Sequence, residues 1–185
     1  MIPVVLSSLG VVYLTVRLAE KILPGSRQRA ALVMMGSLPF LIYCTLILFD
    51  LTLTVFVLGT LLCLLSFAEK RRMLPVVLMG LFLGLGVLTK GPVAYLYVIF
   101  PVLLGPLWGA GNGRWASWYG GFLLAFFLSL IPVLMWLIPV LGESSDNFAF
   151  WLVWEQTAGR ISGSYGAAHT RPVYFYLPLL PVLFL

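Results

Sequence analysis

Charged residues are scarce in this chain of 185 residues. They make up 9% of the sequence, whereas apolar and aromatic residues make up 62%. An ordinary soluble domain carries about 25% charged residues, so a water-soluble globular domain is excluded. Disorder is excluded as well, because disordered segments contain few aromatic residues and 15% of this chain is aromatic. The net charge of +5 is scattered along the chain, which argues against a basic patch for nucleic acid. The sequence predicts an integral membrane protein.

Cysteine and histidine are also rare. Cys44 and Cys63 both lie inside apolar runs, which predicts small buried side chains rather than a disulfide or a metal-binding framework. His169 is the one histidine in the sequence, so no second histidine can complete a zinc site of the usual kind. We therefore predict no metal site, while a divalent metal ion stays open as a cofactor.

Apolar runs bounded by charges divide the chain into membrane segments. A helix needs about 20 mostly apolar residues to cross the hydrocarbon core. The runs that approach this length are residues 2–16, 30–49, 51–68, 74–89, 92–108 and 119–141. The final run, residues 174–185, is too short to cross. We predict an all-α, polytopic transmembrane bundle with about six complete helices and a truncated seventh. We expect residues 1–185 to form a single transmembrane domain that is a fragment of a longer protein.

The basic residues predict how these helices are oriented. Cytoplasmic loops of membrane proteins carry an excess of Lys and Arg. If successive loops alternate sides, most of the basic residues fall on one side, namely Arg17, Lys21, Arg27, Arg29, Lys70, Arg71, Arg72 and Arg114. We predict that this side is cytoplasmic. The other side, with Asp50 and Lys90, then faces outward, and we expect the bacterial inner membrane as the location.

Asp50 and Lys90 are the two charged residues at or near membrane depth. An ionisable group there is costly and suggests a function. Two plainer interpretations stay open. Asp50 is also a favoured residue for capping the helix that follows, by accepting backbone N–H groups near Thr52 or Leu53. Lys90 could be tolerated by extending its ammonium group to the interface.

The polar stretch of residues 143–173 is predicted to be an outer loop. Asp146 or Asn147 can cap a short helix, and Trp151 and Trp154 place that helix along the membrane interface. Further residues of the loop could meet an anion at the lipid boundary, namely Arg160, His169 and Arg171. A phosphate is the natural anion, because a guanidinium group binds it through two parallel hydrogen bonds.

Three runs resemble the membrane glycosyltransferases known as the GT-C class. They are Asp50-Leu51-Thr52-Leu53-Thr54, the run from Gly84 to Pro92 that ends Leu-Thr-Lys-Gly-Pro, and His169-Thr170-Arg171-Pro172 with the Tyr-Phe-Tyr that follows. Within that class the chain resembles the bacterial dolichyl-phosphate-mannose-protein mannosyltransferase type, which includes the aminoarabinose transferases of lipid A.

The resemblance implies an enzyme that moves a sugar from a polyprenyl-phosphate carrier to a lipid or protein acceptor on the outer face. Lys90, Arg160, His169 and Arg171 would then lie near the carrier's phosphate, and Asp50 would be the catalytic carboxylate, with Glu155 as an outside candidate. The family begins with a further membrane helix and a long outer loop that bears an acidic residue. This sequence shows neither, so we expect the fragment alone to be inactive.

Two other functional classes stay open. In a transporter subunit, Asp50 and Lys90 would form an intramembrane pair on a conduction path, but the internal repeats typical of transporters are not visible in the sequence. In a non-catalytic subunit, the chain would bind the lipid carrier without transferring its sugar. Neither the sugar nor the acceptor can be predicted from the residues.

Overall fold

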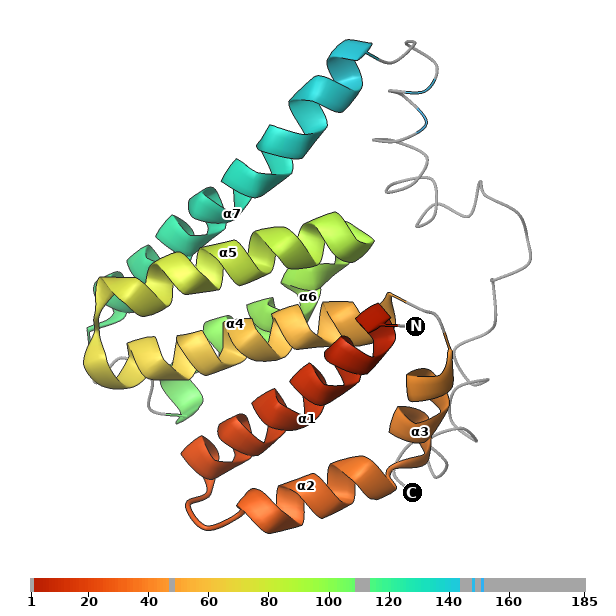
Figure 1. Ribbon diagram of the computed structural model, residues 1–185. Helices are drawn as coiled ribbons and strands as arrows, with labels where there is room; N and C mark the ends of the chain where they lie inside the picture. Colours follow the sequence, from red (N-terminus) through yellow and green to blue (C-terminus); the bar gives the residue numbers. More distant parts are fainter. Residues whose placement is uncertain (1, 47–48, 109–113, 144–147, 149–150, 152–185) are drawn as a thin grey trace, which may run out of the picture. The chain divides into compact units, whose positions relative to one another are not determined.

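The structure, a computed structural model, describes residues 2–46, 49–108, 114–143, 148 and 151, and these residues are almost entirely helical (Figure 1). The helices are α1 (Ile2–Ile22), α2 (Arg27–Gly36), α3 (Leu38–Thr45), α4 (Asp50–Lys70), α5 (Met73–Lys90), α6 (Val93–Leu103), the short 3₁₀ helix η1 (Gly105–Trp108) and α7 (Trp115–Glu143). The chain divides into two compact units, residues 1–133 and 134–185. The first unit contains α1 to α6 and the beginning of α7.

Four of the described helices are long and apolar enough to cross a membrane, namely α1, α4, α5 and residues 115–142 of α7. Each corresponds to a run that the sequence predicts, and the bounds of α4 and α5 differ from the predicted ones by one or two residues. The prediction of an all-α membrane protein is confirmed. α1 extends beyond residue 16 to Ile22, and Arg17 and Lys21 lie in its last turns.

The other two predicted spans are shorter than expected. Residues 30–49 do not form one helix: the chain turns extended at Ser37, with φ −70° and ψ 124°, between α2 and α3. Pro39 accounts for the break, since proline removes an N–H and clashes with the preceding helical turn, but is tolerated at the start of a helix. α6 has 11 residues and is thus about 16 Å long, roughly half of the hydrocarbon core.

α4 lies between α1 and α5 in the first unit (Figure 1). Arg71 and Arg72 alone separate α4 from α5, so these two helices run antiparallel. α1 runs parallel to α4: the hydroxyl groups of Ser7 and Thr52 lie 2.9 Å apart near one end of the pair, and Lys21 Nζ lies 2.7 Å from Glu69 Oε2 near the other. The first residue of α4 is therefore at the same end as the last residue of α5.

Glycines bring α5 close to the first part of α7. A Cβ added at Gly80 would lie 2.7 Å from Leu128 Cβ and 2.8 Å from the carbonyl oxygen of Ala125. One turn later, a Cβ at Gly84 would lie 2.6 Å from the carbonyl oxygen of Ser129. Glycines four residues apart allow two membrane helices to pack backbone against backbone. The main apolar core lies around this contact and includes Leu64, Met79, Leu83, Val98 and Trp118.

Candidate functional site

Asp50 and Lys90 form an ion pair in which Lys90 Nζ donates a hydrogen bond to Asp50 Oδ1. Asp50 is the first residue of α4 and Lys90 is the last of α5, so the antiparallel arrangement brings them together across 40 positions of sequence. Each charge also suits its own helix, because an acidic group is favoured at a helix N-terminus and a basic group at a C-terminus. Both side chains are partly exposed, by 35% for Asp50 and 46% for Lys90. The pair is accessible to a ligand.

Asp50 does not cap α4 with its side chain. The cap position is Phe49, which makes no side-chain cap hydrogen bond, and the N–H of Leu53 bonds the backbone oxygen of Phe49. The capping interpretation from the sequence is therefore wrong, because the carboxylate turns to the ammonium group of Lys90 instead. Thr54 donates to the backbone oxygen of Asp50 at 2.8 Å and steadies this first turn.

A cavity of about 210 Å³ lies beside Asp50. Its wall is mostly apolar, with a few hydroxyl groups and one carboxylate, that of Asp50. The lining residues come from α1 to α4 and the Ser37 break, and they are Val11, Met34, Ser37, Pro39, Phe40, Tyr43, Asp50, Leu51 and Thr54. Such a cavity suits a ligand that is mostly hydrocarbon and bears a polar group at one end.

The remaining predicted site residues, Arg160, His169 and Arg171, lie outside the described residues, as does Glu155. The structure therefore brings two of the five predicted site residues together, Asp50 and Lys90. The predicted outer loop, residues 143–173, likewise lies almost wholly outside them. Within the described part of the chain, no group of three His, Cys, Asp or Glu side chains gathers in the way that holds a metal ion.

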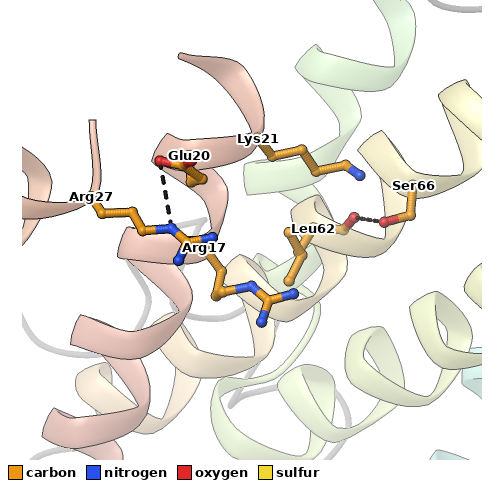
Figure 2. A pocket seen from close by; sticks show the side chains of 6 residues that line it. All are labelled: Arg17, Glu20, Lys21, Arg27, Leu62 and Ser66. Atoms are coloured by element: carbon orange, nitrogen blue, oxygen red, sulfur yellow. Dashed lines mark hydrogen bonds and ion pairs between the residues drawn. The ribbon is translucent and has the colours of Figure 1, made fainter. Parts of the chain in front are cut away.

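A second cavity, of about 220 Å³, lies at the opposite end of α4 and is lined mainly by charged groups (Figure 2). Its lining residues are Arg17, Glu20, Lys21, Arg27, Leu62 and Ser66. In the sequence these basic residues were interpreted only as indicators of topology. The spacing of Arg17, Glu20 and Lys21, three and four residues apart, could have indicated one charged face of a helix.

Arg71 forms a separate charged feature in the turn between α4 and α5. Its backbone is left-handed, with φ +50°, and its guanidinium carbon lies 5.0 Å from the ring of Phe67 and 5.5 Å from that of Trp118. Burial, with a smaller contribution from Arg114, lowers the pKa of Arg71 from its ordinary value. Both terminal nitrogens are buried without a hydrogen bond in the described part of the chain.

Comparison with known proteins addresses the function of this arrangement. The chain is similar to undecaprenyl phosphate-alpha-4-amino-4-deoxy-L-arabinose arabinosyl transferases of Pseudomonas. It is 36% identical over 115 residues to those of Pseudomonas paraeruginosa and Pseudomonas aeruginosa, which covers 62% of this chain and 20% of each relative. It is 33% identical over 103 residues to transferase 1 of Pseudomonas fluorescens, covering 56% of this chain and 17% of the relative.

The chain thus spans about a fifth of the length of these curated relatives. No solved structure matches it. The sequence model of the dolichyl-phosphate-mannose-protein mannosyltransferase family matches residues 1–136, a range that contains both cavities and the Asp50–Lys90 pair. On this match, which extends over well more than half of its residues, the chain belongs to the dolichyl-phosphate-mannose-protein mannosyltransferase family.

Proposed function

We propose that this chain contributes the donor site of a membrane glycosyltransferase that takes a sugar from a polyprenyl-phosphate carrier. The single observation that carries the proposal is the Asp50–Lys90 ion pair, whose carboxylate lines a mostly apolar cavity. A lipid-linked phosphate donor needs a cation for its phosphate, a carboxylate near the reacting carbon and an apolar surface for its chain. The family match and the names of the relatives support the same class of donor.

Two steps of the proposed reaction involve the paired residues. The acceptor hydroxyl attacks the anomeric carbon of the sugar, the bond between that carbon and the phosphate oxygen breaks, and the phosphate leaves with the electron pair. Asp50 takes the proton of the attacking hydroxyl as a general base. Lys90 stabilises the negative charge that develops on the phosphate. We assign Arg160, His169 and Arg171 to the same phosphate.

The ion pair gives Lys90 a partner before the donor arrives. When the phosphate binds, the ammonium group exchanges Asp50 for the phosphate oxygens, and the carboxylate becomes available to the acceptor. The exchange is inexpensive, because a partly exposed ion pair contributes only about 0–1 kcal/mol. An ion pair that costs little to break is suited to a site in which Lys90 must leave Asp50 for the phosphate in each turnover.

We assign the Asp50 end of α4 to the outer face of the bacterial inner membrane, because most basic residues gather at the other end. The acceptor is a lipid or a protein. The chain by itself is expected to bind the donor but not to transfer its sugar, because it spans about a fifth of the length of the relatives.

A binding titration tests the donor site. The protein expressed from its full gene is purified in an uncharged detergent and titrated with a polyprenyl phosphate and with the corresponding uncharged polyprenol. A hydrogen bond to a charged group contributes about 1.5–3 kcal/mol, which corresponds to roughly 10–160-fold in affinity. Lys90→Ala and Arg171→Ala are each expected to weaken phosphate-lipid binding by at least about tenfold.

Exposed basic residues at the other end of α4 provide the matched controls. Lys70→Ala and Arg72→Ala remove the same charge and are expected to leave donor affinity unchanged, since both side chains are exposed. Equal affinity for the phosphate and the alcohol would contradict a phosphate-reading role for Lys90. A transfer assay then separates an enzyme from a carrier-binding subunit: Asp50→Asn is expected to abolish transfer while binding persists.

A further inference from the structure

The second cavity lies at the far end of α4 from the proposed donor site. Glu69, near its C-terminus, is about 28 Å from Asp50 along the helix. The cavity is lined by the last turns of α1, the first residue of α2 and the C-terminal half of α4, because the Pro24–Ser26 turn folds α2 back beside α1. Figure 2 shows Arg17, Lys21 and Arg27 around the same space, with Leu62 and Ser66 forming the wall from α4.

The carboxylates near this cavity are already engaged. Glu20 Oε2 accepts a hydrogen bond from the N–H of Gly25 at 3.1 Å and lies 3.6 Å from Arg27 Nε. Glu69 Oε2 lies 2.7 Å from Lys21 Nζ. Two carboxylates therefore serve three cations, and the lining has a surplus of positive charge.

Of the three cations that line the cavity, Arg17 is the one for which the described part of the chain provides no carboxylate partner. Its Nη1 donates to the hydroxyl of Tyr13 at 3.2 Å, and its guanidinium carbon lies 5.8 Å from the Tyr13 ring centroid. A guanidinium group has several N–H donors, and the hydroxyl of Tyr13 uses only one of them. The others are available on the cavity side, where Arg17 is a lining residue.

We propose that this cavity binds a phosphate group, with Arg17 as its principal ligand and Lys21 and Arg27 as supporting cations. Guanidinium groups bind phosphate through paired, charge-assisted hydrogen bonds. The charged lining of this cavity, and not its volume of about 220 Å³, distinguishes it from the mostly apolar cavity of about 210 Å³ beside Asp50. The helix ends that form the cavity lie where a membrane-spanning bundle meets the headgroups, so a phospholipid is the first source to test and a soluble phosphate is the second.

The experiment uses the full gene product carrying both Lys90→Ala and Arg171→Ala, so that the proposed donor site contributes little to the signal. Calorimetric titrations in an uncharged detergent compare short-chain phosphatidic acid, the matching uncharged diacylglycerol and inorganic phosphate. Phosphatidic acid is expected to bind and the diacylglycerol is not. Arg17→Gln is expected to weaken binding by at least about tenfold, and Arg17→Lys to recover part of the loss, because an ammonium group lacks the planar fork.

Arg29→Gln is the matched control, because Arg29 lies on α2 two residues after Arg27, carries the same charge as Arg17, is exposed and does not line the cavity. It is expected to change affinity by less than about twofold, as for a solvated surface charge. Elution profile and helical circular dichroism verify that each variant is folded. Binding of inorganic phosphate as tight as that of phosphatidic acid, and dependent on Arg17, would assign the site to a soluble phosphate. Equal losses from Arg17→Gln and Arg29→Gln, or equal binding of the diacylglycerol, would overturn the proposal.

Discussion

Gly84 of α5 and Ser129 of α7 are so close that no side chain fits between them: a Cβ at Gly84 would lie 2.6 Å from the carbonyl oxygen of Ser129. The same Cβ would also collide with the ring of Pro132. The obstacle includes backbone, which cannot rotate away as a flexible side chain would. The hydroxyl of Ser129 in turn lies 2.7 Å from that of Tyr95, so α5, α6 and α7 meet at this point.

We predict that Gly84→Ala destabilises the helical bundle. Overpacking costs about 1–3 kcal/mol, whereas the gain in helix propensity from glycine to alanine is about 1 kcal/mol. The expected net loss is up to about 2 kcal/mol, measured as a lower midpoint of thermal unfolding in detergent. Gly120→Ala in α7 is the control, because nothing lies within 4 Å of a Cβ there; this variant should unfold at the same temperature as wild type or higher.

The Asp50–Lys90 ion pair is expected to matter more for function than for stability. Because both side chains are partly exposed, a double-mutant cycle of Asp50→Asn and Lys90→Gln should give a coupling energy of about 0–1 kcal/mol in unfolding experiments. Sugar transfer should nevertheless be lost in each single variant. A coupling energy of several kcal/mol together with unchanged transfer would show that the pair is only structural.

Arg71 and Arg72 are adjacent but differ in surroundings, and we predict different effects of the same substitution. Leaving a buried donor unpaired destabilises the fold by about 1–3 kcal/mol. A cation–π contact stabilises it by about 0.5–2 kcal/mol. Because both terminal nitrogens of Arg71 are unpaired, the cost of burying them exceeds the gain from the cation–π contacts. Arg71→Met, which keeps the packing on Trp118, is therefore expected to raise the unfolding midpoint.

Arg72→Met is the control for this pair, since the side chain of Arg72 is exposed and its loss should change the midpoint little. Arg71→Ala should lower the midpoint, because it also removes the contact with the rings. A fall in stability for Arg71→Met as large as that for Arg71→Ala would mean that the charge itself is stabilising.

Membrane orientation can be tested by labelling single cysteines in a variant in which Cys44 and Cys63 are replaced. We expect a membrane-impermeant thiol reagent, added from outside, to label Ser162→Cys and not Gln28→Cys. The reason is the concentration of basic residues at the Gln28 end, which favours the cytoplasm. The reverse labelling pattern would contradict the outward assignment of Asp50.

The features that the sequence predicted best are those that depend on one helix at a time. The bounds of α4 and α5 follow from apolar runs that end at charges such as Asp50, Glu69 and Lys90, because a charge is costly inside the hydrocarbon. The same reasoning identified Asp50 and Lys90 individually, and the transporter alternative considered them as a pair. Their contact itself depends on the antiparallel packing of α4 and α5, which no local pattern determines.

Other features were missed although their signals are present in the sequence. Pro39 stands inside the predicted span of residues 30–49, but hydropathy does not register the loss of a backbone N–H. Gly80 and Gly84 have the spacing of a helix-packing motif, yet their partner on α7 is more than 40 positions away. The charged cavity around Arg17 needs three helices to converge, so its residues appeared only as topology signals.

The break between α2 and α3 at Ser37 also shapes the cavity beside Asp50. Non-helical backbone at membrane depth is tolerated only where it is covered by protein or lines a polar space, and Ser37 and Pro39 both line the cavity beside Asp50. A continuous helix would have covered that wall of the cavity with apolar side chains and would have paired every peptide group within the helix. The broken helix keeps the peptide groups at the break paired as well: the N–H of Ser37 bonds the backbone oxygen of Met34, and the N–H of Leu41 bonds that of Ser37. The lipid chain of the proposed donor would therefore meet no unpaired peptide group at Ser37 on entering the cavity beside Asp50.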